Sequence, residues 1–431
     1  MSTGNFKVVV IGGGPVGLTA AHALSRAGID FVVLESRPTI VVDAGASLVL
    51  LPSGQRMLAN FGLLEEVNRL STPLDKVQRY DHQGKDIGDA HFFARMKENH
   101  GLAPRVITRL NLTTILLTSL PDKALGALHP SKKVSSITTT DTAITAHCSD
   151  GTSFTGDLLI GADGAHSLAR AFISPTAHTN PFLTTFRTLS FRFPTPPFSK
   201  FFPPGTATET HGPGCAIQAF SADDACALGL YERLPEPTRE RVRYSPEEEA
   251  EVVKRWAHLP VSPGLTLGEA YETRIHAVLT ALEEGVVEDW SGERTVLVGD
   301  AAHKFTPSTG AGWNTGMEDV VVLVNELVRK IKAGGGVVGV VELGEVGRVY
   351  QEARVAAVVA DCELAGRMTR LATWGSGLVW FMDRWIMGSE MVQKFLIDKG
   401  AQVVARTPVL EFVEGDKMEG GRVPWVEREG I

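Results

Sequence analysis

Three glycines near the start of the chain have a spacing that can bind a diphosphate. They follow the apolar run KVVVI at residues 7–11, and a helical pattern begins directly after them. Gly12 permits a tight turn, Gly14 lets the backbone approach a pyrophosphate, and Gly17 lets helix and strand pack closely. The unpaired N–H groups of the helix start add about half a positive charge. We predict a dinucleotide-binding turn, with a merely tight strand–helix turn as the structural alternative. Its residues are Gly12, Gly14, Pro15, Val16 and Gly17.

A carboxylate stands where such a site needs one. The apolar run FVVL is followed directly by Glu35. An acid at the end of the second strand can accept hydrogen bonds from both hydroxyls of an adenosine ribose, and it would repel the 2′-phosphate of NADP. Strand, helix and strand within about thirty residues predict a βαβ unit, which requires a parallel sheet.

Two distant motifs favour FAD over NAD as the dinucleotide. GADGAHSLAR spans residues 161–170, and GDAAHKFTPSTGAGWN spans residues 299–314. FAD is longer than one βαβ unit can hold, and Asp300 at a strand end could bind the ribityl hydroxyls. Backbone N–H groups at a helix start could stabilise the flavin pyrimidine edge, which becomes anionic on reduction. The residues assigned to this part are Asp163, Asp300, Gly310, Ala311, Gly312, Trp313 and Asn314.

The rest of the chain predicts the elements that position these motifs. Residues 134–159 alternate like short strands, and residues 315–332 have a long helical repeat ended by GGG at 334–336. Residues 178–290 are rich in Phe, Pro and Thr and in turn signals, which is typical of an antiparallel sheet, with a helix near 246–257. Residues 77–100 look like a hairpin or an excursion.

Together, the three motifs resemble those of the group A flavin monooxygenases of the para-hydroxybenzoate hydroxylase type. The resemblance covers roughly residues 5–370, and the segment DAGASLVLLPSGQRMLANFGL with His303–Lys304 is most similar to fungal indole-terpenoid and meroterpenoid epoxidases and hydroxylases. It implies an α/β fold, with a Rossmann-like FAD-binding domain, an inserted antiparallel-sheet substrate domain and a helical C-terminus. It also implies cofactor contacts for Ala46 and Arg109. Ser36, Thr309 and Ala311 depart from the commoner pattern of the family.

We place the domain boundaries accordingly. The FAD-binding domain takes residues 1–76, 101–177 and 291–370, the substrate domain takes 77–100 and 178–290, and a helical extension takes 371–431.

The resemblance also implies the reaction. NADPH or NADH reduces FAD, O2 adds to give a flavin C4a-hydroperoxide, and one oxygen atom passes to an electron-rich carbon. The single G-x-G-x-x-G leaves the nicotinamide to bind transiently near Asp163 and Gly164. We expect epoxidation or hydroxylation of an apolar indole or prenylated compound. The alternatives are a phenolic hydroxylase, a non-oxygenating FAD oxidase or dehydrogenase, a halogenase, and a prenyl-binding protein without flavin.

Few side chains could take part in chemistry beside the cofactor. Arg187 and Arg192 lie in an apolar strand, where a charge must be paired or line a cavity. One of them could act on the substrate or open an epoxide; an ordinary salt bridge is the alternative. Pro307 is expected near the flavin, and His303 is expected to be a hydrogen-bonded structural residue. Asp163 could serve the cofactor or simply hold its Asp-Gly turn.

Composition excludes several other classes. The net charge of −8 is spread along the chain and disfavours a nucleic-acid partner. The four cysteines are scattered and the histidines lack the spacing of metal ligands, so we predict neither disulfides nor a metal site. Reduced thiols are typical of a cytoplasmic protein, which we expect here. We expect a monomer or a homodimer. From its polar start and short apolar run, we do not expect residues 1–11 to act as a signal peptide. Residues 374–392 are apolar but interrupted by charges, which predicts a core or interfacial helix with membrane contact not expected.

Overall fold

A five-stranded parallel sheet organises the nucleotide-binding part of the chain. The computed structural model describes residues 6–43, 47–175, 180–336, 338–414 and 418–427. All neighbouring strands of this sheet run parallel. Their spatial order is β19 (Thr295–Leu297), β11 (Leu158–Gly161), β1 (Lys7–Ile11), β2 (Asp30–Leu34) and β7 (Leu128–His129). The strands are continuous apolar runs because both faces are covered.

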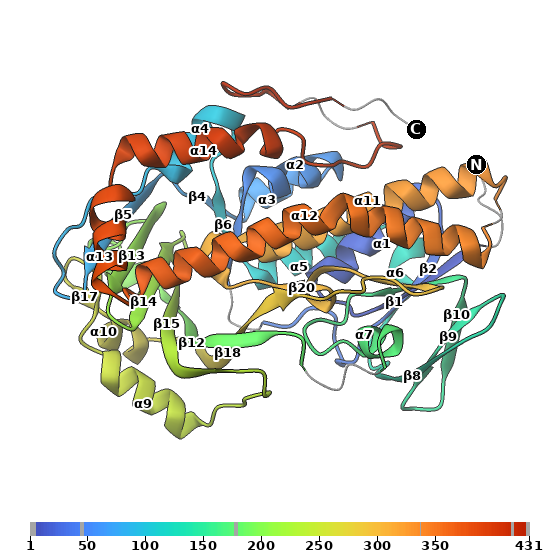
Figure 1. Ribbon diagram of the computed structural model, residues 1–431, viewed down its shortest axis with the longest axis horizontal. Helices are drawn as coiled ribbons and strands as arrows, with labels where there is room; N and C mark the ends of the chain where they lie inside the picture. The colour runs from blue at the N-terminus through green and yellow to red at the C-terminus, as the bar shows by residue number, and fades with distance from the viewer. Residues whose placement is uncertain (1–5, 44–46, 176–179, 337, 415–417, 428–431) are drawn as a thin grey trace.

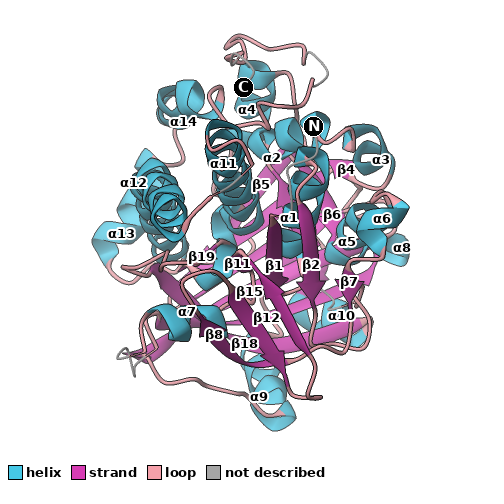
Figure 2. Ribbon diagram, turned by 90° about the vertical axis from the view of Figure 1, so that its right-hand side faces the viewer, coloured by secondary structure: helices cyan, strands magenta, loops and turns pink. Residues whose placement is uncertain are grey.

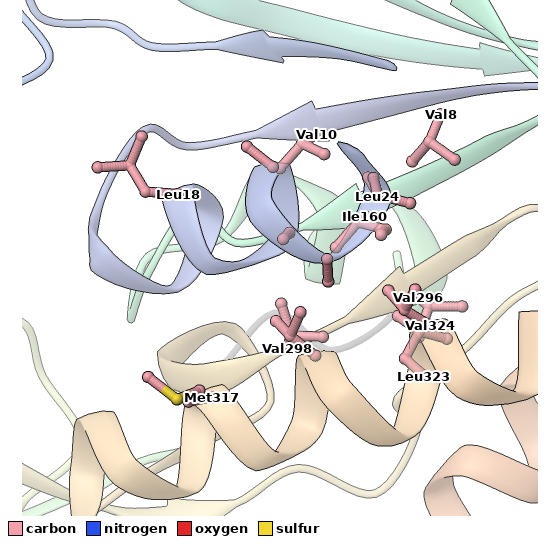
Figure 3. Packing of buried hydrophobic residues seen from close by; sticks show 14 of the residues in the cluster. Val8, Val10, Leu18, Leu24, Ile160, Val296, Val298, Met317, Leu323 and Val324 are labelled. Atoms are coloured by element: carbon pink, nitrogen blue, oxygen red, sulfur yellow. The ribbon is translucent and has the colours of Figure 1, made fainter. Parts of the chain in front are cut away.

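Helices cover one face of this sheet. Helix α1 (Pro15–Ala27) packs beside the long helix α11 (Ala311–Ala333). Figure 3 shows Val8 and Val10 directed at Leu18 and Leu24 of α1, with Met317 of α11 in the same cluster. Helix α12 (Val340–Ala372) lies along α11 on the outside (Figure 1), and α5 (Arg109–Thr118) packs on α1.

A small antiparallel sheet lies against the other side of β1. A Cβ placed on Gly156 would lie 3.1 Å from Cγ2 of Val9, whose side chain alternates with those of Val8 and Val10. The elements of this layer are β8 (Val134–Thr139), β9 (Ile144–Cys148), β10 (Ser153–Gly156) and α7 (Leu168–Ile173).

The second large sheet has seven strands; in Figure 2 its strands β12, β15 and β18 lie in the lower half and β5 lies in the upper half. All pairs are antiparallel except β5 with β13, which run parallel because β5 arrives from the nucleotide-binding part by a crossover. In order, the strands are β20 (His303–Lys304), β18 (His276–Val286), β12 (Leu183–Pro194), β15 (Ala225–Thr238), β14 (Cys215–Ser221), β13 (Thr206–Gly212) and β5 (Lys76–Asp81).

The two faces of the seven-stranded sheet differ in chemistry. One face packs Leu189, Phe191 and Phe193 against α9 (Pro246–Trp256) and α10 (Leu267–Glu272), forming a second hydrophobic core. The other face carries polar side chains, among them Arg192 and Gln218, whose hydrogen bonds to Asp43 and Ser308 connect it to the nucleotide-binding part. The remaining elements before residue 300 are β3 (Ser47–Leu50), α2 (Pro52–Asn60), α3 (Leu64–Arg69), β4 (Thr72–Pro73), α4 (Phe92–His100), β6 (Arg105–Thr108), α6 (Asp122–Leu125), α8 (Thr195–Phe198), β16 (Pro260–Ser262) and β17 (Leu265–Thr266).

The C-terminal region is broken into short helices. Helix α13 (Gly377–Phe381) continues into a π-helical turn, η3 (Met382–Ile386), and α14 (Glu390–Val404) follows. The prediction of one helix over residues 374–392 is therefore wrong, because Gly388 and Ser389 separate η3 from α14. Within the described ranges, no helix combines the length and the apolar composition that crossing a bilayer requires.

The fold class predicted from the sequence is confirmed: an α/β nucleotide-binding part, an inserted sheet and a helical C-terminal region. The residue boundaries between the three units stay a prediction.

Candidate functional site

The first glycine turn leaves no room for side chains at two positions. Gly12 has a φ of +105°, and a Cβ there would lie 2.3 Å from the carbonyl oxygen of Ala162. A Cβ on Gly17 would lie 1.9 Å from the carbonyl oxygen of Gly12. The turn therefore folds only with glycine, and it touches the GADG motif that follows β11.

Gly14 differs from Gly12 and Gly17 because a side chain at this position would not collide with the backbone. Among the residues that the structure describes, a Cβ there would meet only the guanidinium of Arg109, at 3.8 Å. Gly14 precedes Pro15, the first residue of α1, and no side chain caps this helix start. Its N–H groups are thus available to a diphosphate.

Glu35 is held beside this turn. Its buried carboxylate accepts hydrogen bonds from the backbone of Gly13, at 2.8 Å, and from the side chain of Arg37, at 2.9 and 3.0 Å. Burial opposes ionisation, but these hydrogen bonds hold the pKa of Glu35 below its ordinary value. Arg37 makes this ion pair although Ser36 occupies the position directly after the acid.

The second part of the predicted site meets the first at Val16. A Cβ on Gly299 or on Gly316 would lie 3.1 or 2.8 Å from Cγ2 of Val16, so the GD turn and α11 press on the start of α1. Asp300 follows β19 with an exposed side chain. Arg109 lies nearby: burial lowers its pKa, Arg37 lowers it further, and the charges of Asp300 and Glu35 raise it. Arg109 is thus close enough to Asp300 and to Glu35 to respond to the charges of both.

The start of α11 presents a backbone surface with space above it. Gly310 has a φ of +67°, and a Cβ on Gly312 would meet nothing within 4 Å. The indole N–H of Trp313 is buried with no acceptor among the described residues. Asn314 is structural: its amide donates to the carbonyl oxygens of Val49 and Gly310, at 3.0 and 2.7 Å. Ala311 begins the helix.

A buried acid that the sequence analysis missed orients the GD turn. Asp319, which is fully buried, accepts hydrogen bonds from the backbone of Gly299 at 3.0 Å, from His303 at 2.6 Å and from Arg354 at 3.0 Å. Burial opposes ionisation, but His303 and Arg354 hold the pKa of Asp319 below its ordinary value. His303 is therefore a structural residue, as expected. An acid inside the apolar repeat of residues 315–332 was the available signal.

Asp163 caps its own turn. One carboxylate oxygen accepts from the backbone N–H groups of Leu168 and Ala169, at 2.7 and 3.2 Å, and the other is buried without a partner among the described residues. The first oxygen has the turn-holding role that was one of the two alternatives. The second leaves a cofactor contact open as a proposal.

The two candidate arginines lie on opposite faces of the seven-stranded sheet. Arg192 is on the face toward the nucleotide-binding part, where its guanidinium donates to Asp43 at 2.5 Å while its Nε–H is buried without an acceptor among the described residues. Arg187 lies on the other face and donates to Glu232 at 2.7 Å, beside α9. It makes the ordinary salt bridge that was its alternative reading.

The loop before α11 approaches the same sheet face. Gln218 of β14 donates to the carbonyl oxygen of Ser308 at 3.1 Å. Pro307, which precedes Ser308 in this loop, is exposed. Ala46 lies outside the described residues.

These features fit a flavin dinucleotide. Space for a ligand at Gly14 and Gly312, the unsatisfied indole of Trp313 and the exposed carboxylate of Asp300 are groups that such a cofactor could contact. Glu35 lies beside the first glycine turn, where the adenosine ribose would be held.

Comparison with known proteins agrees with this geometry. The FAD binding domain family matches residues 5–337. The FAD-dependent monooxygenase srdH of Neurospora crassa is 30% identical, covering 98% of this chain and 99% of its own. The FAD-dependent monooxygenase nodM of Hypoxylon pulicicidum is 32% identical over 77% of this chain and 73% of its own. Among solved structures, HpxO of Klebsiella pneumoniae with FAD and uric acid has a TM-score of 0.74 at 21% identity, covering 93% of this chain and 97% of its own.

The family match spans all three converging motifs, and the relatives named are monooxygenases. The chain therefore belongs to this FAD-binding family and is an FAD-dependent monooxygenase.

Proposed function

We propose that this enzyme transfers one oxygen atom from O2 to an electron-rich carbon of an apolar indole or prenylated metabolite, with NADPH or NADH as reductant. The observation that carries the proposal is the convergence of the two glycine turns and Asp300 beside a sheet face that bears Arg192. Bound FAD would supply hydride acceptance and the activation of O2.

Different groups of the chain bind different parts of FAD. The N–H groups at the start of α1 bind the pyrophosphate, Glu35 the adenosine ribose and Asp300 the ribityl hydroxyls. The N–H groups at the start of α11, from Ala311 to Trp313, face the flavin pyrimidine edge and stabilise negative charge there. Arg109 and Pro307 border the ring site.

Arg192 is the side chain placed to act on the substrate. Asp43 accepts a hydrogen bond from its guanidinium, and its Nε–H is buried without an acceptor among the described residues. We propose that it stabilises negative charge on the substrate oxygen, including during opening of an epoxide. Arg187 has no such position. Asp163 and Gly164 stay the proposed place of transient NAD(P)H binding.

The cysteines bear on the cellular location. All four cysteines are free thiols, which favours a cytoplasmic location. A monomer or a homodimer is proposed.

The test combines oxygen labelling with site variants. Purified enzyme should be yellow, oxidise NADPH or NADH faster when a suitable indole or prenylated compound is added, and place one atom of labelled O2 in the product. Arg192→Lys should keep FAD binding but lower the yield of labelled product by about tenfold or more. Fast NAD(P)H oxidation that yields only hydrogen peroxide across the panel, or a protein that cannot be loaded with flavin, would contradict the proposal.

A further inference from the structure

Large apolar side chains gather on the outside of the C-terminal region. Ten of them, 40% to 77% exposed, lie within α13, η3 and α14, whereas the other nine exposed large apolar residues are scattered over the rest of the described chain. We call these ten residues the C-terminal apolar surface. They are Leu378, Trp380, Phe381, Met382, Trp385, Ile386, Met391, Phe395, Leu396 and Val403.

Two polar side chains of the same helices point inward, although Glu390 and Lys399 are exposed. Asp383 is fully buried and accepts hydrogen bonds from His211 and from Trp374, both at 2.8 Å, and from Arg79. Gln393 is 2% exposed, and its amide donates to the carbonyl oxygen of Met387 at 2.7 Å. A water-facing helix shows the reverse arrangement, with apolar residues inside and polar residues outside. Large apolar side chains outside and buried polar side chains inside suit contact with an apolar medium.

The charges around the surface favour lipid over a second copy of the chain. Its acids are already paired within the chain: Glu390 with Lys394 at 2.6 Å, and Asp398 with Arg95. Arg384 lies over the ring of Trp385, at 5.5 Å, and Lys399 is exposed on α14. A two-fold dimer through this surface would oppose it to itself and bring like cations together. Anionic headgroups would instead complement them.

Tryptophan and phenylalanine are also the residues that suit the boundary between lipid and water. The helices are too short to span a bilayer but can lie in its surface. We propose that the C-terminal apolar surface docks the enzyme peripherally on anionic membranes.

The test is co-flotation of the FAD-loaded enzyme with vesicles, which needs no substrate and no turnover. Wild-type protein should float with phosphatidylcholine vesicles that contain phosphatidylserine, and less with phosphatidylcholine alone. The triple variant Trp380→Ser, Trp385→Ser and Phe395→Ser should bind about tenfold or more weakly. The matched control is Val341→Ser, because Val341 is 78% exposed but lies at the start of α12, outside the surface. It should float like wild type.

The charge reversals Arg384→Glu and Lys399→Glu should reduce binding to the anionic vesicles only. Equal melting temperatures and flavin contents would show that the variants are folded. Wild-type protein that floats with neither vesicle, or a triple variant that floats as well as wild type, would overturn the proposal. So would a wild-type dimer that the triple variant converts to a monomer, since a second copy would then cover the surface.

Discussion

Two glycines of the nucleotide site should respond in opposite ways to an added methyl group. A Cβ on Gly17 would overlap the backbone of Gly12, whereas Gly312 has open space and lies in the first turn of α11. We expect Gly312→Ala to keep or slightly raise the melting temperature without FAD, because alanine favours the helix by up to about 1 kcal/mol. The same variant should bind FAD about tenfold or more weakly, since the methyl occupies the cofactor's space.

Gly17→Ala is the contrasting variant and should fail to fold the turn, with loss of both stability and flavin. Thermal melting with and without FAD, together with flavin titration, separates the two effects. Unchanged FAD affinity in Gly312→Ala would show that the flavin does not approach α11 at this point.

A buried histidine should make the protein sensitive to mild acid. Burial lowers the pKa of His22 to about 4, and its ring bonds to the carbonyl oxygen of Leu116 at 2.7 Å. The unfolded chain takes up this proton near pH 6.5, so stability is lost as the pH falls from there toward 4. Between pH 7.5 and 5 we expect wild type to lose about 2 kcal/mol more unfolding free energy than His22→Gln. Urea titrations at the two pH values measure this, and parallel losses would contradict it.

Site residues could be predicted where short-range spacing defines them. Gly12, Gly17 and Asp300 belong to motifs whose chemistry follows from a turn next to a strand. The contacts of Asp319 and Asp43 could not be predicted, because Arg354 and Arg192 are distant in sequence and only packing brings them near. One signal was present but unused. Arg187 and Arg192 are an odd number of positions apart on one strand, so they must point to opposite faces.

At the level of elements, Asp319 joins α11, α12 and the GD turn. Replacing it by asparagine keeps the shape but removes the charge opposite Arg354. We expect Asp319→Asn to cost about 1–3 kcal/mol of stability, because the buried guanidinium of Arg354 keeps Glu318 but loses the charge of Asp319. Flavin affinity should also fall, since Gly299 loses its anchor. The exposed pair Arg348–Glu352 on α12 offers a control, and Glu352→Gln should change stability by less than about 1 kcal/mol.

The buried pair of Asp383 and His211 attaches η3 to β13. Burial opposes the charged form of both residues. Asp383 nevertheless raises the pKa of His211, and His211 and Arg79 lower the pKa of Asp383. The histidine's contribution is full below pH 6.5 and is lost as the pH rises through its raised pKa, and the acid's is lost as the pH falls below about 4.

We therefore expect the stability difference between wild type and His211→Gln to be largest between about pH 4.5 and 6.5 and to shrink in alkali. Chemical unfolding across pH measures it. A difference that grows with rising pH would show that His211 is neutral in the folded protein.

The same region shows what hydropathy leaves undecided. The composition of residues 374–392 was compatible with a core or an interfacial helix. The choice depends on which side chains find partners, and Asp383 turns inward only because Arg79 and His211 come from distant strands. The break at Gly388 was a local signal that the single-helix prediction passed over.

For the whole molecule, the layered α/β architecture was predictable because the buried parallel strands read as short apolar runs before glycine-rich turns. The parallel pairing of β5 with β13 was not, because it joins residues about 130 positions apart through no local pattern. Such a pairing is determined by the packing of the nucleotide-binding part against the seven-stranded sheet.

Strand β1 has consequences for the growing polypeptide. Its neighbour β11 lies about 150 residues downstream, and β19 with Asp300 lies about 280 residues downstream. At a synthesis rate of about 5–20 residues per second, β1 waits roughly 8–30 seconds on the ribosome for β11, and β19 follows roughly 15–55 seconds after β1. Ribosome-bound chains arrested before residue 295 should remain sensitive to protease even with FAD added, whereas released full-length chains become protected. Flavin loading is thus a late event in biogenesis, and chaperones that shield strand edges would set its yield.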